Sequence, residues 1–331
     1  MVLSHITATG AYLPSRIVTN AEIGKIVGLD DRAIYRRTGI RERRWADEKE
    51  ATSDLAAQAA RQALAQLDLD PKEIDLILVA TTSPDMFFPS TACLVQEKIG
   101  AVRAAGFDLS ASCSGFIFAL SVADQYLKSQ QACLSGRQAK TVLVIAAEVK
   151  SRFLNYDDPG TAILFGDGAG AVLLQASEGK RGILSCHLRT DGSKRDLIEI
   201  PGGGSRSPIT RETLGLNTIR MKGNRLFRTV VREFEQAVQE TLKQHRLLIS
   251  DVDHFIFHQA NRRMLESLTR KCRIPMEKVA MVIERYGNTS SSSIPIALHA
   301  AHEAGHLKPG HLIFLGGVGG GLTGGTALIR W

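Results

Sequence analysis

Hydrophobic and polar residues follow two patterns along the chain, one typical of buried strands and one typical of helices. Continuous apolar runs of strand length occur at Ile74–Val79, Thr141–Ala147, Val252–Phe257 and His311–Leu315. Helical patterns precede the first and third runs, over Ser53–Leu67 and about Asn224–His245. Strands that alternate with helices usually form sheets covered by helices, so the sequence predicts an α/β fold.

The chain also carries a faint internal repeat. An offset of 178 residues separates the strand pattern at Ile74 from that at Val252, and the same offset maps Ser114–Leu120 onto Ser292–Leu298. Two matches at one offset indicate a duplicated unit. We therefore expect two similar α/β halves packed together, the first over residues 1–175 and the second over 176–331.

Composition fits this size and class. The 331 residues suit about two domains, and 44% hydrophobic with 23% charged residues is ordinary for a globular protein. Lys and Arg total 41 against 34 Asp and Glu, a net charge of +7 that suits an acidic or phosphorylated partner. Because no nucleic-acid-binding motif accompanies this charge, we expect no nucleic-acid partner.

The cysteines and the termini bear on location. Five cysteines, an odd number without a C-x-x-C pair, favour a reducing compartment over a disulfide framework. The first residues lack a secretory pattern, and the weakly polar stretch His311–Ile329 contains seven glycines, which makes it a poor membrane helix. We expect a cytoplasmic protein that does not bind a membrane.

Cys113 is the first candidate for chemistry. Gly106–Leu109 resembles the end of a strand, and the residues after Cys113 resemble an apolar helix that runs to about Lys128. A thiol near a helix N-terminus ionises more easily, because unpaired N–H groups and the helix dipole stabilise the thiolate. A buried structural cysteine is the alternative, since that is the usual role of this residue type.

Two polar residues occupy comparable positions in the second half. His258 follows the apolar strand Phe255–Phe257, and α/β folds place their sites at such strand ends. Asn288 lies in a polar turn that the 178-residue offset makes the counterpart of the cysteine turn. The repeat therefore predicts that Cys113 and Asn288 face each other, although plain turn chemistry also accounts for an asparagine there.

A histidine pair invites a metal-site interpretation that we reject. His302-Glu303-Ala304-Gly305-His306 matches the H-E-x-x-H pattern of zinc hydrolases. However, Gly305 and the nearby Pro309 predict that the helix ends before His306, so the two histidines would not share the helical face that a metal requires. We therefore expect no metal.

A glycine-rich run near the end of the sequence is a second false lead. Gly319, Gly321 and Gly324 satisfy the G-x-G-x-x-G spacing of dinucleotide-binding loops. That fingerprint needs a following helix, whereas the strand-like run Thr326–Arg330 follows here. A dinucleotide cofactor is not expected.

Taken together, several segments resemble the β-ketoacyl-acyl carrier protein synthase III family of thiolase-fold condensing enzymes. The similarity spans nearly the whole chain and rests on Arg37–Arg43, Asp108–Phe116, Phe165–Ala171, His258–Asn261, Gly287–Ser290 and Gly319–Gly321. It implies a five-layer αβαβα thiolase-like fold built from two duplicated halves, a homodimer, and no resident cofactor, because acyl-CoA is a substrate.

The resemblance implies a decarboxylating Claisen condensation that initiates fatty-acid biosynthesis. An acyl-CoA primer, acetyl-CoA or a similar short one, would combine with malonyl-acyl carrier protein to give a 3-oxoacyl-acyl carrier protein, CoA and CO₂. The resemblance makes Cys113 the nucleophile, and makes His258 and Asn288 the groups that stabilise the malonyl enolate. Backbone N–H groups of Cys113 and Gly320 would form the oxyanion hole.

Further positions carry over from the family. The CoA-binding set is Arg37, Arg152, Gly223 and Asn224, and Phe88 belongs to the acyl pocket. The residues that would dock the acidic carrier protein are Arg228, Gln259, Ala260, Asn261, Arg262, Arg263, Arg270 and Lys271. Solvated helix faces are the alternative explanation for these charges.

The sequence departs from the family pattern at two places and leaves other functions open. Ala33 replaces the usual tryptophan beside the CoA adenine, and Gly324 replaces a tryptophan near the final glycines. The same fold could serve an acyl transferase or a primer-loading ketosynthase of a secondary or cofactor pathway. A metal hydrolase that uses the histidine pair and a non-catalytic carrier-binding protein are further alternatives.

Overall fold

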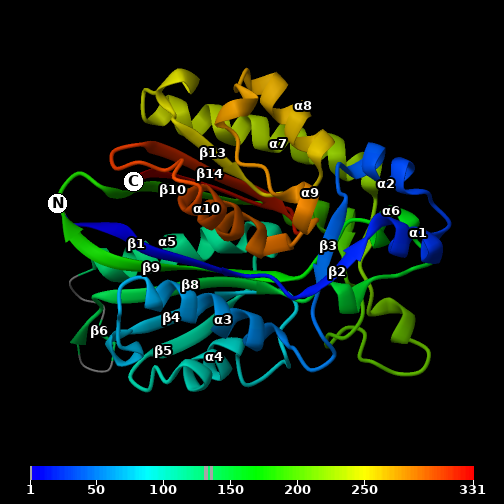
Figure 1. The fold of residues 1–331 in the computed structure, drawn as a ribbon, viewed down its shortest axis with the longest axis horizontal. Coiled ribbons are helices and arrows are strands. Elements are labelled where there is room, and N and C mark those ends of the chain that lie inside the picture. Colours follow the sequence, from blue (N-terminus) through cyan, green and yellow to red (C-terminus); the bar gives the residue numbers. More distant parts are fainter. Residues whose placement is uncertain (1, 130–132, 135–136) are drawn as a thin grey trace.

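Two stacked β-sheets with helices between and outside them form the body of the molecule (Figure 1). The structure is a computed structural model that describes residues 2–129, 133–134 and 137–331. The first sheet has the strand order β1-β9-β8-β4-β5, with bounds β1 Val2–Tyr12, β9 Gly168–Glu178, β8 Thr141–Glu148, β4 Leu76–Ala80 and β5 Ala105–Leu109.

The second sheet repeats most of the first. Its order is β10-β15-β14-β13, with bounds β10 Gly182–Thr190, β15 Thr323–Arg330, β14 Leu312–Gly319 and β13 His254–Phe257. The pair β13–β14 is parallel, as β4–β8 is, and the remaining pairs β14–β15 and β15–β10 are antiparallel, as β8–β9 and β9–β1 are. The two sheets therefore share one topology.

Three helix layers complete the arrangement (Figure 1). Helices α3 (Thr52–Ala65) and α4 (Thr91–Ile99) cover the outer face of the first sheet, and α7 (Gly223–Gln244) and α8 (Arg262–Cys272) cover the outer face of the second. Helices α5 (Gly115–Lys128) and α10 (Ser293–Glu303) fill the space between the sheets. The five-layer αβαβα expectation is confirmed.

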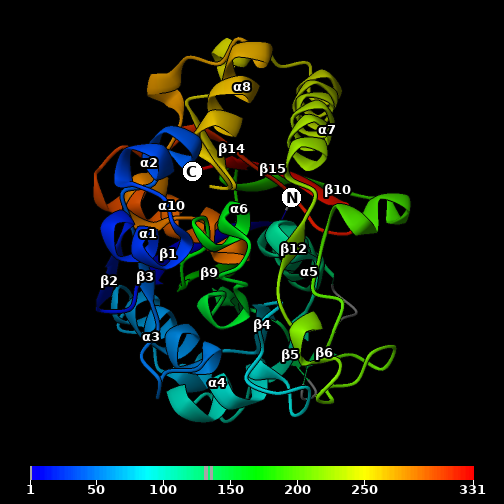
Figure 2. The same cartoon turned by 90° about the vertical axis from the view of Figure 1, so that its right-hand side faces the viewer.

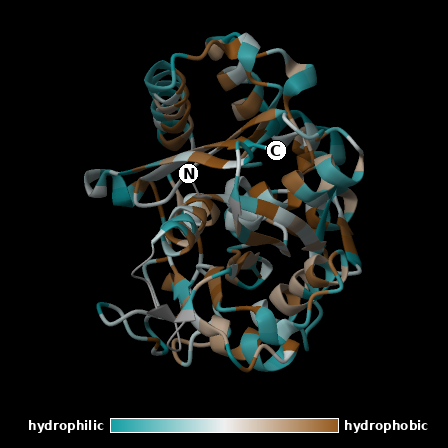
Figure 3. Cartoon of the chain, turned by 90° about the vertical axis from the view of Figure 1, so that its left-hand side faces the viewer, coloured by the Kyte–Doolittle hydropathy of each residue, from teal (hydrophilic) through white to brown (hydrophobic). Residues whose placement is uncertain are grey.

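Burial explains why these segments take these forms. Every residue of β4 and β8 is buried, as expected for strands covered by helices on both faces. Helix α7 instead buries one stripe at four-residue spacing, namely Leu226, Val230, Phe234 and Val238. Figure 3 shows the same helix with polar residues toward solvent and apolar residues toward the sheet.

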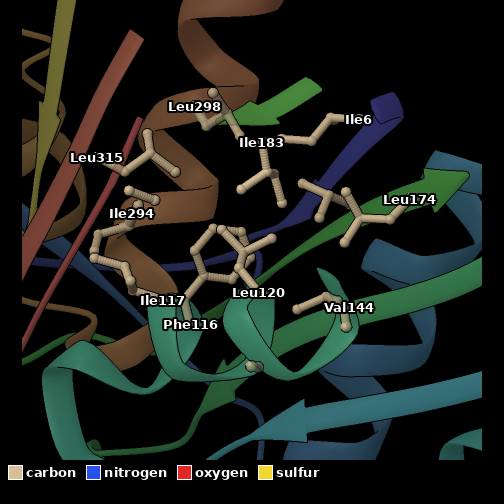
Figure 4. Close-up of a cluster of buried hydrophobic side chains, with 14 of the residues drawn as sticks. Ile6, Phe116, Ile117, Leu120, Val144, Leu174, Ile183, Ile294, Leu298 and Leu315 are labelled. Carbon is tan, nitrogen blue, oxygen red and sulfur yellow. The ribbon is translucent and has the colours of Figure 1, made fainter. Parts of the chain in front are cut away.

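The central layer ties the two sheets together. Phe116 and Leu120 of α5 and Leu298 of α10 are fully buried in a cluster that draws side chains from both sheets (Figure 4). Gly170 lets α10 approach the first sheet closely, because a Cβ on this glycine would lie 2.7 Å from Pro295 Cβ. The two halves consequently share one core.

The internal repeat is confirmed at the level of individual residues. Helix α5 begins at Gly115 and α10 begins at Ser293, which is the 178-residue offset. Each helix follows a 3₁₀ turn, η2 (Ser112–Ser114) or η8 (Ser290–Ser292), whose first residue has a positive φ, +48° at Ser112 and +55° at Ser290. The predicted division between residues 175 and 176 falls inside β9, and the next strand, β10, begins at Gly182.

Smaller elements gather at one end of the layers, at the right of Figure 1 and facing the viewer in Figure 2. Those labelled there are β2 Arg16–Thr19, β3 Glu42–Trp45, α1 Asn20–Val27, α2 Asp31–Thr38, α6 Pro159–Ala162, β12 Arg220–Met221 and α9 Ile283–Tyr286. The remaining short strands are β6 Cys133–Leu134, β7 Arg137–Gln138 and β11 Ile198–Glu199. The remaining 3₁₀ helices are η1 Pro71–Glu73, η3 Ser151–Phe153, η4 Gly192–Leu197, η5 Leu214–Leu216, η6 Ile249–Asp251 and η7 Met276–Lys278.

The predicted elements agree with this structure to within a few residues at their ends. The helical patterns became α3 and α7, and the four apolar runs became β4, β8, β13 and β14. Among the described residues, no helix combines the length and apolar character that crossing a bilayer requires.

Candidate active site

The predicted catalytic residues line one cavity. It has a volume of about 450 Å³, and Cys113, His258, Asn288 and Gly320 all contribute to its wall. Much of the remaining wall is apolar and comes from Ile163, Leu164, Phe165, Ile198, Met221, Leu226 and Val318. A cavity with an apolar wall and a few convergent polar groups is the usual form of a small-molecule site.

Cys113 lies in the turn η2 immediately before α5, as the sequence predicted. The residue is 6% exposed, so its thiol is largely withdrawn from bulk water. Sγ lies 3.6 Å from Oγ of Ser290, which belongs to the equivalent turn η8 of the second half. The two repeated turns thus meet at the thiol of Cys113.

His258 follows β13, and a hydrogen bond at Nδ1 fixes its ring. Its Nδ1 lies 2.7 Å from Ser293 Oγ, and the backbone N–H of Gln259 also donates to that oxygen at 3.2 Å. This anchoring leaves Nε2 for the cavity, and the nearby imidazole favours the thiolate form of Cys113, which lowers the pKa of the thiol. The orientation of the imidazole is therefore fixed by a serine at the first residue of α10.

Asn288 is held by both its backbone and its side chain. Its N–H donates to Leu164 O at 2.9 Å, and its carbonyl accepts from Gly166 N at 3.0 Å. Its Oδ1 accepts from the N–H of Ser290 at 2.8 Å, which leaves the Nδ2 group as a donor toward the cavity. The side chain thus presents a fixed hydrogen-bond donor, as expected of a group that binds a carbonyl oxygen.

The thiol of Cys113 is poised for ionisation. Burial alone would raise its pKa, but attraction to His258 and hydrogen bonds from His258 and Ser290 outweigh burial and lower the pKa to about 7. The nearby Glu148 carboxylate opposes this shift. A substantial fraction of thiolate is therefore present near neutral pH, as nucleophilic catalysis requires.

The predicted oxyanion-hole donors come from Cys113 and from the turn between β14 and β15. Gly319 allows this turn to touch η2, because a Cβ on Gly319 would lie 2.5 Å from Cys113 N. The N–H of Gly320, next along the chain, donates to Ser112 Oγ at 3.1 Å. The Gly320 N–H thus points at the turn that carries Cys113.

The sequence analysis did not identify Glu148, a buried residue that fixes one turn of the site by hydrogen bonds. This residue ends β8 and is fully buried. Its carboxylate accepts from Ser291 Oγ at 2.8 Å and from Ser83 Oγ at 2.5 Å, and it pairs with Lys150 Nζ at 3.1 Å. Because Ser291 lies within η8, Glu148 fixes the turn that places Ser290 beside Cys113. Its position after a buried strand, like that of His258, was the available signal.

Positive charges surround the mouth of the cavity. Arg37, Arg228 and Arg263 are exposed and contribute to the cavity wall, as do Gly223, Asn224, Ala260 and Asn261. Within the described part of the chain, none of these three arginines forms an ion pair. Asn261 donates from Nδ2 to Arg37 O at 3.1 Å and caps α8. Unpaired cations beside a deep cavity suit a phosphorylated or acidic ligand.

Other positions implied by the resemblance lie outside this cavity wall. Arg152 donates to the carbonyls of Asp47, Glu48 and Glu50, and Phe88 is 85% exposed. Arg262 pairs with Glu266 at 2.9 Å and Lys271 with Glu235 at 2.9 Å, while Arg270 is exposed on α8. The structure therefore does not bring Arg152 or Phe88 to the cavity of their own chain.

The expectation for Gln259 is corrected. This residue is fully buried, and its amide donates to Phe257 O at 2.8 Å and to Ala280 O at 3.1 Å. Its Oε1 accepts from the N–H groups of Val282 and Ile283. Gln259 thus secures the segment that leads to α9 and has no surface to offer a carrier protein.

The two rejected motifs have ordinary structural surroundings. Helix α10 ends at Glu303, and the ring of His302 lies 5.3 Å from that of Trp331 while the ring of His306 lies 6.4 Å from that of His254. The described residues hold no cluster of three or more metal-ligating side chains. The glycine run forms the turn between β14 and β15 with no helix after it.

The two departures have distinct surroundings. Tyr35, near Ala33, packs under the guanidinium of Arg41 at 4.4 Å and is hydrogen bonded by Arg262. A Cβ on Gly324 would meet Val318 Cγ2 at 3.7 Å, an ordinary contact, and Gly324 borders a second cavity of about 370 Å³ beneath α7. That cavity includes Glu233 and Thr241 of α7 in its wall and does not include Cys113.

Known proteins resemble this chain over its whole length. The model of the 3-oxoacyl-[acyl-carrier-protein] synthase III family matches residues 107–192, and the model of that family's C-terminal part matches residues 242–331. The β-ketoacyl-[acyl-carrier-protein] synthase III of Paramagnetospirillum magneticum is 46% identical over 335 residues, which cover 100% of this chain and 99% of that protein.

Solved structures agree. The crystal structure of 3-oxoacyl-[acyl-carrier-protein] synthase III from Aquifex aeolicus is 44% identical, has a TM-score of 0.91, and covers 99% of this chain and 100% of that one. The priming β-ketosynthase of the R1128 polyketide biosynthetic pathway is 32% identical with a TM-score of 0.91, and covers 99% and 96% of the two chains. These findings confirm the predicted thiolase-like fold and acyltransferase class. The chain belongs to the 3-oxoacyl-[acyl-carrier-protein] synthase III family of condensing enzymes.

Proposed function

We infer that this protein condenses an acyl-CoA primer with malonyl-acyl carrier protein, releasing CoA and CO₂, and so initiates fatty-acid synthesis. The observation that carries this inference is the convergence of a thiol, an imidazole and a carboxamide in one cavity, from Cys113, His258 and Asn288. The full-length relatives named as synthase III support it over a specialised primer-loading role, because identity to them reaches 46% against 32% for the polyketide priming enzyme.

The first step is acyl transfer to Cys113. Its thiolate attacks the thioester carbonyl, the new S–C bond forms, and the carbonyl oxygen becomes an oxyanion near the N–H groups of Cys113 and Gly320. Collapse of this intermediate breaks the bond to CoA, and the CoA thiolate leaves and takes up a proton. The thiolate fraction provided by His258 makes this attack possible near neutral pH.

The second step is decarboxylation of the malonyl thioester. Nε2 of His258 and Nδ2 of Asn288 donate to its carbonyl oxygen, on which negative charge grows as the carboxyl C–C bond breaks and CO₂ departs. Ser293 and the N–H of Ser290 hold the two donors in place before substrate arrives. Donors fixed in advance stabilise such charge without reorganisation.

The third step joins the two substrates. The enolate carbon attacks the acyl carbonyl held on Cys113, and a C–C bond forms. The tetrahedral intermediate then collapses, the bond to Sγ breaks, and the 3-oxoacyl chain stays on the carrier protein. The reaction needs no resident cofactor, because acyl-CoA enters as a substrate.

The exposed arginines supply the binding surface for both substrates. Arg37 and the backbone at Gly223 and Asn224 lie where the CoA phosphates would enter the cavity, and Arg228 and Arg263 face an acidic carrier protein. Charge complementarity of this kind mainly speeds association and weakens with salt. The carrier protein would dock on α7 and the start of α8.

A second copy of the chain is proposed to cover the edge of the first sheet. Strand β5 is an edge strand with the exposed Phe107 on it and the exposed Val102 three residues before it. The exposed Met86, Phe87 and Phe88 precede α4, whose first N–H groups donate to Asp108 of β5. Exposed apolar patches beside an unpaired strand favour association. In this homodimer Phe88 lines the acyl pocket of the second copy, which accounts for its absence from the cavity of its own chain.

The state of the cysteines supports a reducing, cytoplasmic location. Cys93, Cys113, Cys186 and Cys272 all carry free thiols, and the nucleophile requires a free thiol.

The pH dependence of Cys113 is a direct consequence of its charge partner. Alkylation by iodoacetamide should rise through a pKa of about 7, because the thiolate is the reactive form. In His258→Ala, burial is no longer opposed by the imidazole, so the pKa of Cys113 should rise from about 7 to about 8 or above, and alkylation at pH 7 should slow at least about fivefold. Peptide mass spectrometry over a pH series measures this, with the exposed Cys93 as internal control. An unchanged profile in the variant would contradict the charge pair.

Loss of Asn288 should separate the two half-reactions. Asn288→Ala removes one fixed donor from the enolate, so release of labelled CO₂ from malonyl-acyl carrier protein should fall about 100- to 1000-fold. Acylation of Cys113 by acetyl-CoA should stay nearly normal, since Asn288 does not act on the thiol. His258→Ala should impair both steps. Normal decarboxylation by both variants would contradict the proposed condensation mechanism.

Reversal of the charge of Arg263, at the cavity wall, should impair the reaction with the carrier protein only. Arg263→Glu should slow turnover with malonyl-acyl carrier protein about tenfold at low salt and less at high salt. Acylation by acetyl-CoA should change little. Lys72→Glu, an equal charge change on exposed η1 at the amino end of β4, is the matched control. Equal loss of both steps in Arg263→Glu would assign the residue to the active site or to folding.

The proposed dimer is tested by sedimentation. The wild-type protein should sediment at twice the 36.0 kDa mass of one chain. Phe87→Glu places a charge in the apolar patch and should shift the equilibrium to monomer, whereas Leu248→Glu, at an exposed apolar position after α7, should not. A wild-type monomer at micromolar concentration would refute the assembly.

A further inference from the structure

The oxyanion donor Gly320 is already occupied by another residue of the chain. Its N–H donates to Ser112 Oγ at 3.1 Å, a normal length for such a bond. The Ser112 hydroxyl also lies 3.9 Å from Cys113 Sγ, so it is adjacent to the atom that attacks the substrate. A serine oxygen thus sits where the carbonyl oxygen of a bound thioester would accept its hydrogen bond.

The backbone holds this hydroxyl in place. Ser112 has φ +48°, in the left-handed region that residues other than glycine seldom adopt. Its repeat counterpart, Ser290, has φ +55° and places its own hydroxyl 3.6 Å from the same sulfur. Ser290 helps lower the pKa of Cys113, whereas the hydroxyl of Ser112 accepts the hydrogen bond of the Gly320 N–H. The two hydroxyls therefore have different partners.

We propose that Ser112 is a built-in occupant of the oxyanion hole, which holds the Gly320 N–H while the site is empty and turns aside when a thioester carbonyl arrives. This proposal rests on the acyl transfer to Cys113 proposed above. A serine side chain has three staggered positions, so one rotation about χ1 clears the space. The second contact of the hydroxyl, to Cys113 Sγ at 3.9 Å, is long and therefore weak. Little besides the hydrogen bond from Gly320 opposes the rotation.

The proposal predicts that removing the hydroxyl speeds acylation and leaves thiolate formation unchanged. In the wild type, the thioester carbonyl must displace the Ser112 hydroxyl from the Gly320 N–H. In Ser112→Ala or Ser112→Gly there is no hydroxyl to displace. The expected gain is about two- to tenfold, the range that corresponds to one neutral hydrogen bond. Ser112→Gly retains the left-handed backbone without strain, so it covers the case in which the alanine variant folds poorly.

Two reagents separate this role from a structural one. Iodoacetamide alkylates the thiolate by displacement and forms no oxyanion, whereas p-nitrophenyl acetate acylates it through an oxyanion and needs no CoA site. Both rates are measured at Cys113, with Cys113→Ala as background, Ser110→Ala as the matched exposed-serine control, and acetyl-CoA as a third reagent.

The ratio of acylation to alkylation should rise two- to tenfold in both Ser112 variants and stay constant in Ser110→Ala. An unchanged ratio would overturn the proposal, and a lower ratio would do so by showing that Ser112 donates to the oxyanion. If acetyl-CoA fails to acylate the wild type while the p-nitrophenyl acetate ratio still rises, the proposed function fails and the role of Ser112 stands.

Discussion

A thiolate withdrawn from water needs nearby groups that favour its charge, and this requirement explains most of what surrounds Cys113. Burial alone would leave the thiol protonated at neutral pH, and His258 reverses that balance to give a pKa of about 7. The two residues come from different halves of the chain. The reaction therefore depends on how firmly the halves are packed together, and the shared core between the sheets provides that packing.

Each proposed catalytic group is held in place by hydrogen bonds from neighbouring residues. Ser293 at the start of α10 orients the imidazole of His258. The Asn288 amide is set by the N–H of Ser290, and its backbone is set by Leu164 and Gly166. Beneath them, buried Glu148 holds η8 through Ser291. Hydrogen bonds from the serine-rich turn thus restrict the rotation of the side chains of His258 and Asn288. Donors fixed in this way are what stabilisation of transient charge requires.

The sequence predicted the layers, the repeat and the meeting of Cys113, His258 and Asn288 in one cavity, because these leave periodic or positional signals. Buried strands are continuous apolar runs, and the 178-residue offset places Ser112 and Ser290 in equivalent turns. Other features leave no such signal. Burial of Gln259 depends on the carbonyls of Phe257 and Ala280, which are brought together by folding. The position of Phe88 depends on which face of the molecule its loop reaches, and the occupancy of the Gly320 donor depends on one rotamer of Ser112.

The most direct test of condensation at Cys113 is peptide mapping after incubation with labelled acetyl-CoA, followed by addition of malonyl-acyl carrier protein. The acetyl mass should appear on the peptide that contains Cys113 and should then move into a 3-oxoacyl-acyl carrier protein as CO₂ is released. Label that persists on a Cys113→Ala variant, or an acetyl group on Cys113 that malonyl-acyl carrier protein never removes, would contradict the account.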